Sequence, residues 1–500
     1  MAARSPVSRT SAPGLRLGVR RLAGHLSALA ARERLRDPPL AALAALSVLL
    51  AVASLALPSA PGYDPWSWLI WGRELGDLDL STSEGPAWKP LPVLVTAALT
   101  SLAEDLAPEA WLVVARAGAI LATLLAAWLA RRLSGGSRAA GIAAGAGLLL
   151  VPGWVEGAAV GTSEGLLVGL ALLALKNVRD GRLRAAFVLG VLAALLRVEA
   201  WPFVAVLGAL VVRDDRAALG PVLLAGVGVG VLWFVPEWLA SGELLRSADR
   251  ARVPNPGAPG LAARPVLATL ATALSLTPAI ALAGLAALAA GARARVARPA
   301  RDAYVVAGVG AAWIVLVAAM SELGFSGEAR YLLPGVALLT AAGMAGPFVL
   351  LSAATPRHAR LRRAGRRVVA VLLALALAGS AYARADALRE GLAGVAYGAA
   401  LAGDLERAIA GAGSARDLMR CGPPYVGAYR GPMLAWTLGL HKTEIDFVPS
   451  RPGVAFRSRL GRGSPLAPPG PPGGADHSLR RGLWLIEGAC EPASARGRAR

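Results

Sequence analysis

The chain has 500 residues, of which 55% are hydrophobic and only 17% are charged. A soluble globular chain carries about 25% charged residues, so this composition excludes both a disordered chain and a fully water-soluble one. The net charge of +20 would suit a nucleic-acid binder, but the basic residues lie between apolar runs. That distribution is typical of a membrane protein, so nucleic acid is not an expected partner.

Eleven apolar runs are predicted to cross a membrane. A bilayer core requires about 20 apolar residues per helix, and fewer where loops enter the membrane. The run 90–103 is short and flanked by proline, so we predict an interfacial helix there rather than a crossing. The predicted crossings are 40–58, 110–131, 139–152, 162–178, 183–197, 201–213, 219–236, 264–290, 303–320, 331–352 and 367–384.

The basic residues give this arrangement an orientation, because cytoplasmic loops are enriched in Lys and Arg. Segments on the N-terminal side of the predicted membrane hold 27 of these residues, and segments on the other side hold 8. We therefore expect a cell-membrane protein with a basic cytoplasmic tail at 1–39. A transmembrane domain at 40–385 would carry the outer loop 59–109, and a separate extracytoplasmic domain would occupy 386–500.

The C-terminal domain is expected to be small and of mixed α/β structure. A helix is predicted at 386–412 and strands at 444–449 and 482–487. Cys421 and Cys490 both fall on the oxidising side of the membrane, where a disulfide between them would stabilise a small domain. The alternative is two unpaired thiols.

The ionisable residues that do not belong to the basic loops collect at the outer face. Such groups near a membrane are costly, and this makes them candidates for function. The first outer loop holds Asp64, three tryptophans, the pair Arg73-Glu74 and Lys89-Pro90. Carboxylates and cations at one face indicate a site for a charged lipid headgroup. Later outer segments add Glu164, Arg197, Glu199, Arg330 and Tyr331.

This ordered set resembles the GT-C membrane glycosyltransferases, most closely those that use dolichyl- or undecaprenyl-phosphate sugars. The resemblance covers residues 40–352 and includes Asp64, Arg73-Glu74 and Lys89-Pro90. Further matches are Thr162–Glu164, where the family often has a Thr-Asp pair, and the Arg330-Tyr331 loop. Pro65 departs from the pattern, because many relatives carry a second acid there, and this leaves metal binding open.

The resemblance implies an all-α polytopic membrane enzyme of bacterial type. Its relatives move a sugar from a polyprenyl-phosphate donor to an acceptor, here an envelope glycan, lipid or protein, with inversion. Asp64 would act as the base, and Lys89 and Arg330 would hold the leaving phosphate. The structural alternatives are a helix cap for Asp64, a lysine at headgroup level for Lys89, and an ion pair with Glu328 or Glu322 for Arg330.

Six further residues are candidate substrate contacts: Arg73, Glu74, Glu164, Arg197, Glu199 and Tyr331. Structural readings compete with this role. Arg73 with Glu74, and Arg197 with Glu199, would form local ion pairs. Glu164 would cap a helix, and Tyr331 would belong to an aromatic belt at the membrane surface.

Two other classes of function are weighed against the enzyme. A transporter or flippase of a lipid-linked sugar would favour charged or broken helices at the bilayer midplane and internal repeats. A non-catalytic envelope-assembly protein would keep the fold and use the outer domain for binding. The charges at one face and the lack of a visible repeat favour the enzyme.

Overall fold

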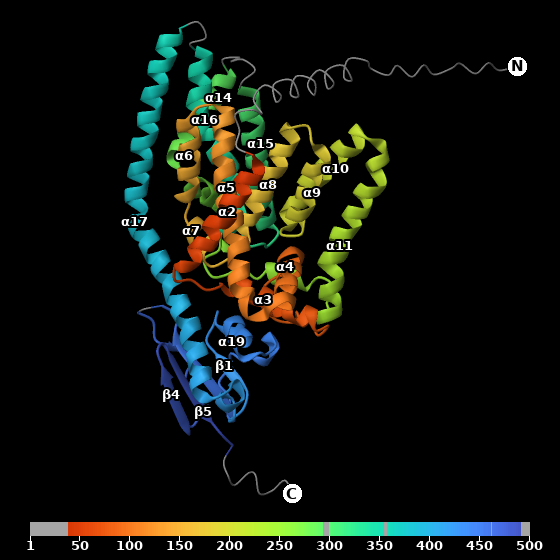
Figure 1. Cartoon of the computed structure of the whole chain (residues 1–500), viewed down its shortest axis with the longest axis vertical. Helices are drawn as coiled ribbons and strands as arrows, with labels where there is room; N and C mark the ends of the chain where they lie inside the picture. The colour runs from red at the N-terminus through yellow and green to blue at the C-terminus, as the bar shows by residue number, and fades with distance from the viewer. Residues whose placement is uncertain (1–38, 294–299, 355–357, 462, 492–500) are drawn as a thin grey trace, which may run out of the picture.

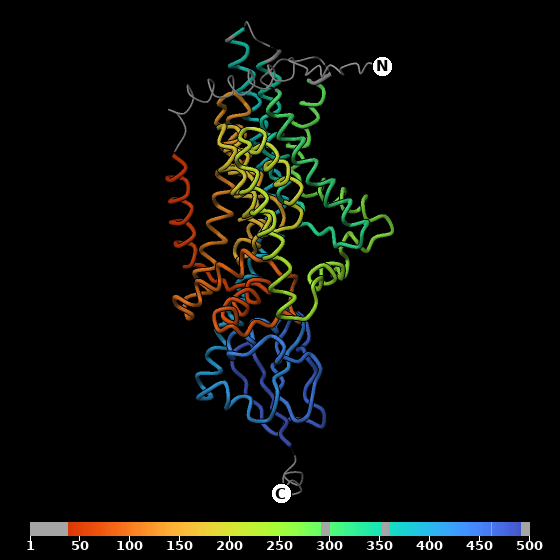
Figure 2. The backbone as a smooth tube through the Cα atoms, turned by 90° about the vertical axis from the view of Figure 1, so that its right-hand side faces the viewer, coloured from red at the N-terminus to blue at the C-terminus, as the bar shows by residue number. Residues whose placement is uncertain are grey.

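A computed structural model describes residues 39–293, 300–354, 358–461 and 463–491. The predicted basic tail 1–39 therefore lies almost entirely outside the described residues. The described chain forms a bundle of helices with a small sheet domain at one end (Figure 1). The same division is seen from the side, where the C-terminal residues lie beyond the bundle (Figure 2).

Helices occupy all eleven positions where crossings are predicted. The first half contains α2 (Leu40–Ala53), α3 (Tyr63–Gly76), α4 (Pro90–Ala103), α5 (Ala107–Leu133), α6 (Arg138–Leu149), α7 (Trp154–Ala159), α8 (Glu164–Arg179), α9 (Leu183–Ala194), α10 (Trp201–Asp214) and α11 (Leu219–Ser241). The second half contains α12 (Arg246–Ala251), α13 (Pro265–Leu276), α14 (Ala279–Arg293), α15 (Ala300–Glu322), α16 (Ala329–Ala354), α17 (Ala359–Ala412), α18 (Ala415–Leu418) and α19 (Gly431–Leu438).

The expected count of eleven crossings is too high for full-length spans. Among the described residues, five helices are long and apolar enough to cross a membrane, or six if the pair α13 and α14, bent by 104°, counts as one. The helices α6 and α9 have 12 residues each, which corresponds to about 18 Å. A hydrocarbon core is about 30 Å thick, so these helices reach only part of the way across. The chain is a multi-pass membrane protein.

A helix forms at Pro90–Ala103, as the sequence predicts, and it is counted together with α5 in one candidate span, Pro90–Leu133. Ala103 has an extended backbone, with φ −164° and ψ 91°, and this breaks the helical path between α4 and α5. The Thr96 hydroxyl donates to the Trp68 carbonyl at 2.6 Å, which joins α4 to α3. A Cβ atom on Gly72 would lie 2.6 Å from Thr96 Oγ1, so only glycine permits this approach.

The helix α17 differs from the expectation of two elements. A crossing at 367–384 and a separate helix at 386–412 are predicted, but one helix of 54 residues runs through both. Its length is about 80 Å, at 1.5 Å per residue. The helix has no proline to break it and ends before Gly413, which has φ +93°. It follows one side of the bundle and continues to the sheet domain (Figure 1).

The sheet domain contains a small mixed sheet. The strand order is β1-β2-β5-β4, with β1 parallel to β2 and the other neighbours antiparallel, and β3 pairs with β2. The predicted strand 482–487 corresponds to β5, whereas the strand predicted at 444–449 is wrong, because only Asp446 forms an isolated bridge there. The strands are β1 (Pro424–Val426), β2 (Gly453–Arg459), β3 (Leu466–Ala467), β4 (His477–Arg481) and β5 (Trp484–Ala489).

The sheet packs on the far end of α17. Trp484 is fully buried, and its indole N–H donates to the Leu401 carbonyl at 2.8 Å. The backbone N–H of Leu483 donates to the Asp404 carboxylate, also at 2.8 Å. The long helix α17 therefore holds the sheet domain at a fixed position relative to the bundle.

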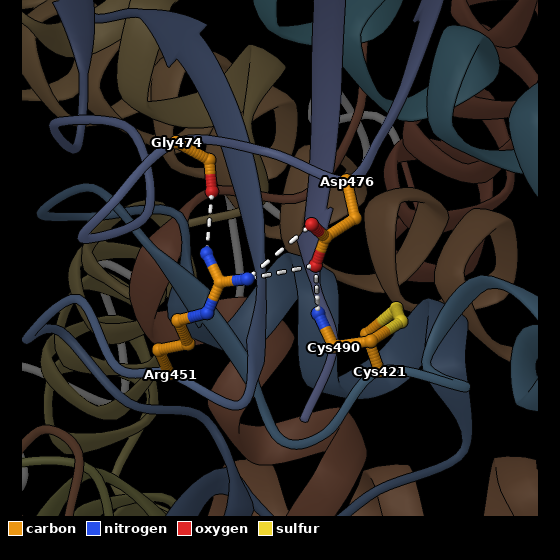
Figure 3. The surroundings of a disulfide bond; sticks show 5 residues. All are labelled: Cys421, Arg451, Gly474, Asp476 and Cys490. Atoms are coloured by element: carbon orange, nitrogen blue, oxygen red, sulfur yellow. Dashed lines mark hydrogen bonds and ion pairs between the residues drawn. A yellow bond between two sulfur atoms is a disulfide. The ribbon is translucent and has the colours of Figure 1, made fainter. Parts of the chain in front are cut away.

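A disulfide joins Cys421 to Cys490, and no cysteine is free. Figure 3 shows its surroundings, in which the backbone N–H of Cys490 donates to Asp476 at 2.7 Å. Asp476 also forms an ion pair with Arg451 at 3.1 Å. The end of β5 is thus fastened to Cys421 by a covalent bond and to Asp476 by a hydrogen bond, and Arg451 in turn holds Asp476 in place.

Candidate functional site

A cavity of about 1030 Å³ lies where the bundle meets the sheet domain. Its walls come from the start of α3, the segment 86–89, the turn 196–201, the end of α11 and the segment 325–331, together with loops of the sheet domain. Asp64, Lys89 and Arg330 all line it. Other charged lining residues are Arg197, Glu199, Glu237, Arg250 and Glu328.

The centre of the charged lining is Arg330, the second residue of α16. Its guanidinium contacts Asp64 Oδ2 at 2.9 Å through Nη1, and Glu328 Oε2 at 2.9 Å through Nε. Gly327 allows the turn that brings Arg330 there, since it has φ +61° and a Cβ atom would lie 2.4 Å from the Thr269 hydroxyl. The predicted pair of Arg330 with Glu328 exists, and Asp64 is a second partner.

Asp64 is the second residue of α3, and its side chain does not cap the helix. The N-cap position is Gly62, without a side-chain hydrogen bond. The carboxylate of Asp64 points instead to Arg330, a residue 266 positions away in the chain. A carboxylate that lines a cavity and is held by one cation has the placement expected of a general base.

Lys89 is buried, with 6% of its surface exposed. Its ammonium donates to the Ser163 hydroxyl at 3.2 Å, lies 3.9 Å from Glu164 and is 4.9 Å from the centre of the Trp68 ring. Burial, aided by the positive charge of Arg197, lowers the pKa of Lys89 from its usual 10.5 to about 8, although Glu164 opposes this effect. The side chain is therefore not a solvated lysine at headgroup level.

Arg197 connects three of the other predicted residues. It donates to Glu164 at 2.7 Å, lies 3.9 Å from Glu199, and its guanidinium carbon is 3.9 Å from the centre of the Tyr331 ring. Arg197, Glu199 and Tyr331 line the cavity, whereas Glu164 stands behind the lining and pairs with both buried cations. The helix α8 receives no side-chain cap from Glu164.

Arg73 and Glu74 do not line the cavity. Arg73 donates to the Leu440 carbonyl at 2.8 Å, and Glu74 lies 2.8 Å from His441 Nδ1. They do not form the predicted local ion pair with each other, since Arg73 is instead 3.7 Å from Glu104. Burial raises the pKa of Glu74, and the contact with His441 opposes that shift. Both side chains hold the sheet domain against α3.

The cavity is also lined by residues that are not among the candidates predicted from the sequence, including Tyr63, Arg250, Tyr429 and Phe447. Arg250 donates to the Val253 carbonyl at 3.1 Å and has no ion pair among the described residues. The rings of Tyr63 and Tyr429 lie 6.3 Å apart, edge to face, and Tyr429 has φ +67°. Tyr63 directly precedes Asp64, so its place beside the predicted base could have been noticed in the sequence. Nothing in the sequence places the rings of Tyr429 and Phe447 over the cavity.

No three His, Cys, Asp or Glu side chains of the described cavity lining bring their ligand atoms within 4.8 Å of one another. Among the described residues, the one group of three close metal-binding side chains is Cys421, His477 and Cys490. Its two sulfur atoms are joined in the disulfide and are not thiolates. Two of the cavity carboxylates, Asp64 and Glu328, are engaged by one arginine.

No family model matches this sequence, and no curated protein matches it. Among solved structures, the chain is similar to the crystal structure of ArnT from Cupriavidus metallidurans in the apo state. The TM-score is 0.45 at 20% sequence identity, over 80% of this chain and 84% of that chain. A similarity of this size does not bear on activity.

Proposed function

We propose that the cavity catalyses the transfer of a sugar from a polyprenyl-phosphate donor to an acceptor hydroxyl, with inversion. The observation that carries this proposal is the pairing of Asp64 with Arg330 at 2.9 Å inside a cavity that Lys89 also lines. One carboxylate and two cations, brought together from distant parts of the chain, supply a base and a phosphate site. Apolar walls beside them suit a lipid chain.

The leaving phosphate would bind between Lys89 and Arg330. Both cations are already held in place by neighbouring residues, so they need little rearrangement when negative charge develops. The cavity wall next to them carries large apolar side chains that would face the prenyl chain. These are Trp88, Leu196, Trp201, Trp233, Phe234 and Val317.

Asp64 would take the proton of the acceptor. In the free protein its carboxylate is bound to Arg330, and a donor phosphate would compete for that guanidinium and release the carboxylate. The acceptor oxygen then forms a bond to the anomeric carbon, the bond between that carbon and the phosphate oxygen breaks, and the phosphate keeps the electron pair. The proton of the acceptor hydroxyl moves to Asp64.

The acceptor would approach from the sheet domain. Tyr429 and Phe447 of that domain and Tyr63 of α3 stand at the same cavity. Their rings offer apolar faces with adjacent polar groups, which suits a sugar or another amphipathic acceptor. We place this end of the bundle outside the cytoplasm, so the acceptor belongs to the cell envelope: a glycan, a lipid or a protein.

The test is the substitution Asp64→Asn, which keeps the size of the side chain and removes the base. Transfer should fall by about 10²–10⁴-fold. Donor lipid should accumulate in the cells, and envelope glycans should lose the transferred sugar. Asp77→Asn serves as the matched control, because Asp77 is an exposed residue at the end of the same helix. Normal transfer by a well-expressed Asp64→Asn protein would contradict the proposal.

A flippase of a lipid-linked sugar is the second candidate. The bent pair α13 and α14, with its angle of 104°, is a broken helix of the kind that transporters use. The break at Thr277 and Pro278 does not line the charged cavity, and for this reason the enzyme ranks first. A flippase predicts that purified protein transfers no sugar to an acceptor supplied on the same side as the donor.

A further inference from the structure

A second hollow, of about 530 Å³, lies apart from the charged cavity, along α5, α7 and α17. Its lining is almost entirely apolar and includes Leu124 and Trp154. Leu57 and Leu392, at its edge, are 67% and 41% exposed. The hollow therefore opens to the surface through apolar side chains, as a groove rather than a closed void. We name it the Arg116 groove, after its one charged residue.

Arg116 is 5% exposed, and all of its hydrogen-bond partners are uncharged. The guanidinium donates to the Ser54 carbonyl at 3.2 Å, the Ser54 hydroxyl at 3.0 Å and the Ala159 carbonyl at 2.7 Å, and also to the Ser59 hydroxyl. Its Nε atom has no hydrogen-bond partner among the described residues. No ion pair of Arg116 with a carboxylate occurs in that part of the chain.

This state of Arg116 differs from that of the other deeply buried cations. Each of them has a glutamate within 4 Å: Lys89, Arg197, Arg246 and Lys442. A buried charge without a counter-ion costs several kcal/mol even after relaxation, and in a membrane segment such a charge marks a functional site by default. An anion brought by a ligand would supply the missing partner.

Arg116 lies in the half of the membrane nearer the sheet domain, about 8 Å short of the headgroup level if Arg131 marks the opposite boundary of the hydrocarbon core. Arg131, at the opposite end of the helix, is fifteen residues away, or about 22 Å. A hydrocarbon core is about 30 Å thick, so Arg116 lies toward the headgroup region on the side of the sheet domain. Because the walls of the groove are apolar, they suit an acyl chain better than a small soluble anion.

We propose that the Arg116 groove binds a phospholipid with an anionic headgroup. The lipid phosphate would pair with the guanidinium, and an acyl chain would lie against Leu124 and Leu57. Ser54 and Ser59 would turn their hydroxyls toward the phosphate, because a hydroxyl donates as readily as it accepts. This inference is independent of the proposed glycosyl transfer.

The experiment compares lipids bound to the purified full chain. Detergent-solubilised protein is mixed with phosphatidylglycerol or phosphatidylcholine, and bound lipid is counted by native mass spectrometry, with the unfolding temperature as a second readout. Wild-type protein should retain phosphatidylglycerol preferentially and unfold at a higher temperature with it. Arg116→Gln should bind roughly tenfold less, the equivalent of one charge-assisted contact.

Two further variants make the result decisive. Leu124→Trp fills the groove and leaves Arg116 in place, so it should also abolish the preference even if Arg116→Gln fails to fold. Arg184→Gln, at a side chain 75% exposed, should change nothing. Equal binding of the two lipids by wild type, a preference that survives Leu124→Trp, or the same stabilisation by inorganic phosphate alone would each overturn the proposal.

Discussion

At the scale of single residues, Lys89 shows how burial would prepare a cation for the proposed binding of a phosphate. The ammonium is held by Ser163 and Glu164 and faces the Trp68 ring. Burial destabilises its charged form, so the pKa falls to about 8 and the proton is held only loosely. A bound donor phosphate would raise the pKa of Lys89 again, since an adjacent negative charge favours the protonated lysine.

This arrangement predicts a pH effect on donor binding. As the pH rises through about 8, Lys89 loses its proton and the phosphate site loses a positive charge, so the KM for the donor should rise. Lys89→Arg keeps the charge at every such pH, and its donor KM should stay flat between pH 7 and 9.5. The measurement is the donor KM across this range for both proteins. The same alkaline rise in both would show that Lys89 is not its source.

The residues of the first loop also show where reading the sequence falls short. Asp64 and Arg73 are nine residues apart in one helix, and at 3.6 residues per turn that separation is two and a half turns. The two side chains therefore leave α3 on opposite faces, Asp64 toward the cavity and Arg73 toward Leu440 of the sheet domain. Charge and order along the chain predict that these residues gather at one end of the bundle, but not in which direction each side chain leaves its helix.

At the scale of the elements, an apolar run in the sequence predicts the position of a helix better than it predicts the length of that helix. The apolar run 264–290 contains Thr277 and Pro278, where α13 and α14 meet at 104°. The run 367–384 merges with the following polar helix because no residue stops it. Hydropathy records the environment of a segment, whereas bends and continuations depend on local backbone restraints and on packing.

Close contacts between helices determine where the buried charged side chains lie. Gly165 follows Glu164 in α8, and a Cβ atom there would lie 2.5 Å from the Cβ of Ala119 in α5. Gly118 of α5 meets Leu166 in the same way, with a distance of 2.7 Å to its Cα. Small residues at such a crossing let the two backbones approach, and this approach fixes the position of Glu164 near Lys89.

Gly165→Ala should therefore destabilise the protein. The added methyl group must push α8 away from α5, at a cost of about 1–3 kcal/mol, and sugar transfer should fall with it. Gly226→Ala is the matched control, a helical glycine of α11 with open space around it. That change should be neutral, or should stabilise by up to about 1 kcal/mol. Thermal unfolding in detergent measures both, and equal unfolding temperatures would contradict the packing argument.

At the scale of the whole molecule, the sheet domain completes the cavity. Trp436 packs against Trp66 at 6.1 Å between ring centres, and Lys442 pairs with Glu84 at 2.8 Å. These contacts hold the loop that carries Tyr429 over the start of α3. The sequence predicts a separate domain but not this contact, because docking depends on the surfaces of two folded parts rather than on a pattern within either.

The charges of the whole chain predict its orientation in the membrane. Arg182, which directly precedes α9, and Arg184, the second residue of α9, lie at the end of α8 opposite to Glu164 and the cavity. Basic residues of this kind remain in the cytoplasm, so the cavity and the sheet domain should face outward. Phosphate groups carried by a lipid donor would then be met at the outer leaflet.

Cysteine labelling tests this orientation, because both native cysteines are bonded to each other and give no background. Arg389→Cys, on the part of α17 near the sheet domain, should react with a membrane-impermeant maleimide in intact cells. Arg184→Cys should react only after the membrane is opened. Both positions are open to reagent, since the arginine side chains there are 78% and 75% exposed. The reverse labelling pattern would place the cavity in the cytoplasm, where a nucleotide sugar rather than a lipid-linked one would be the accessible donor.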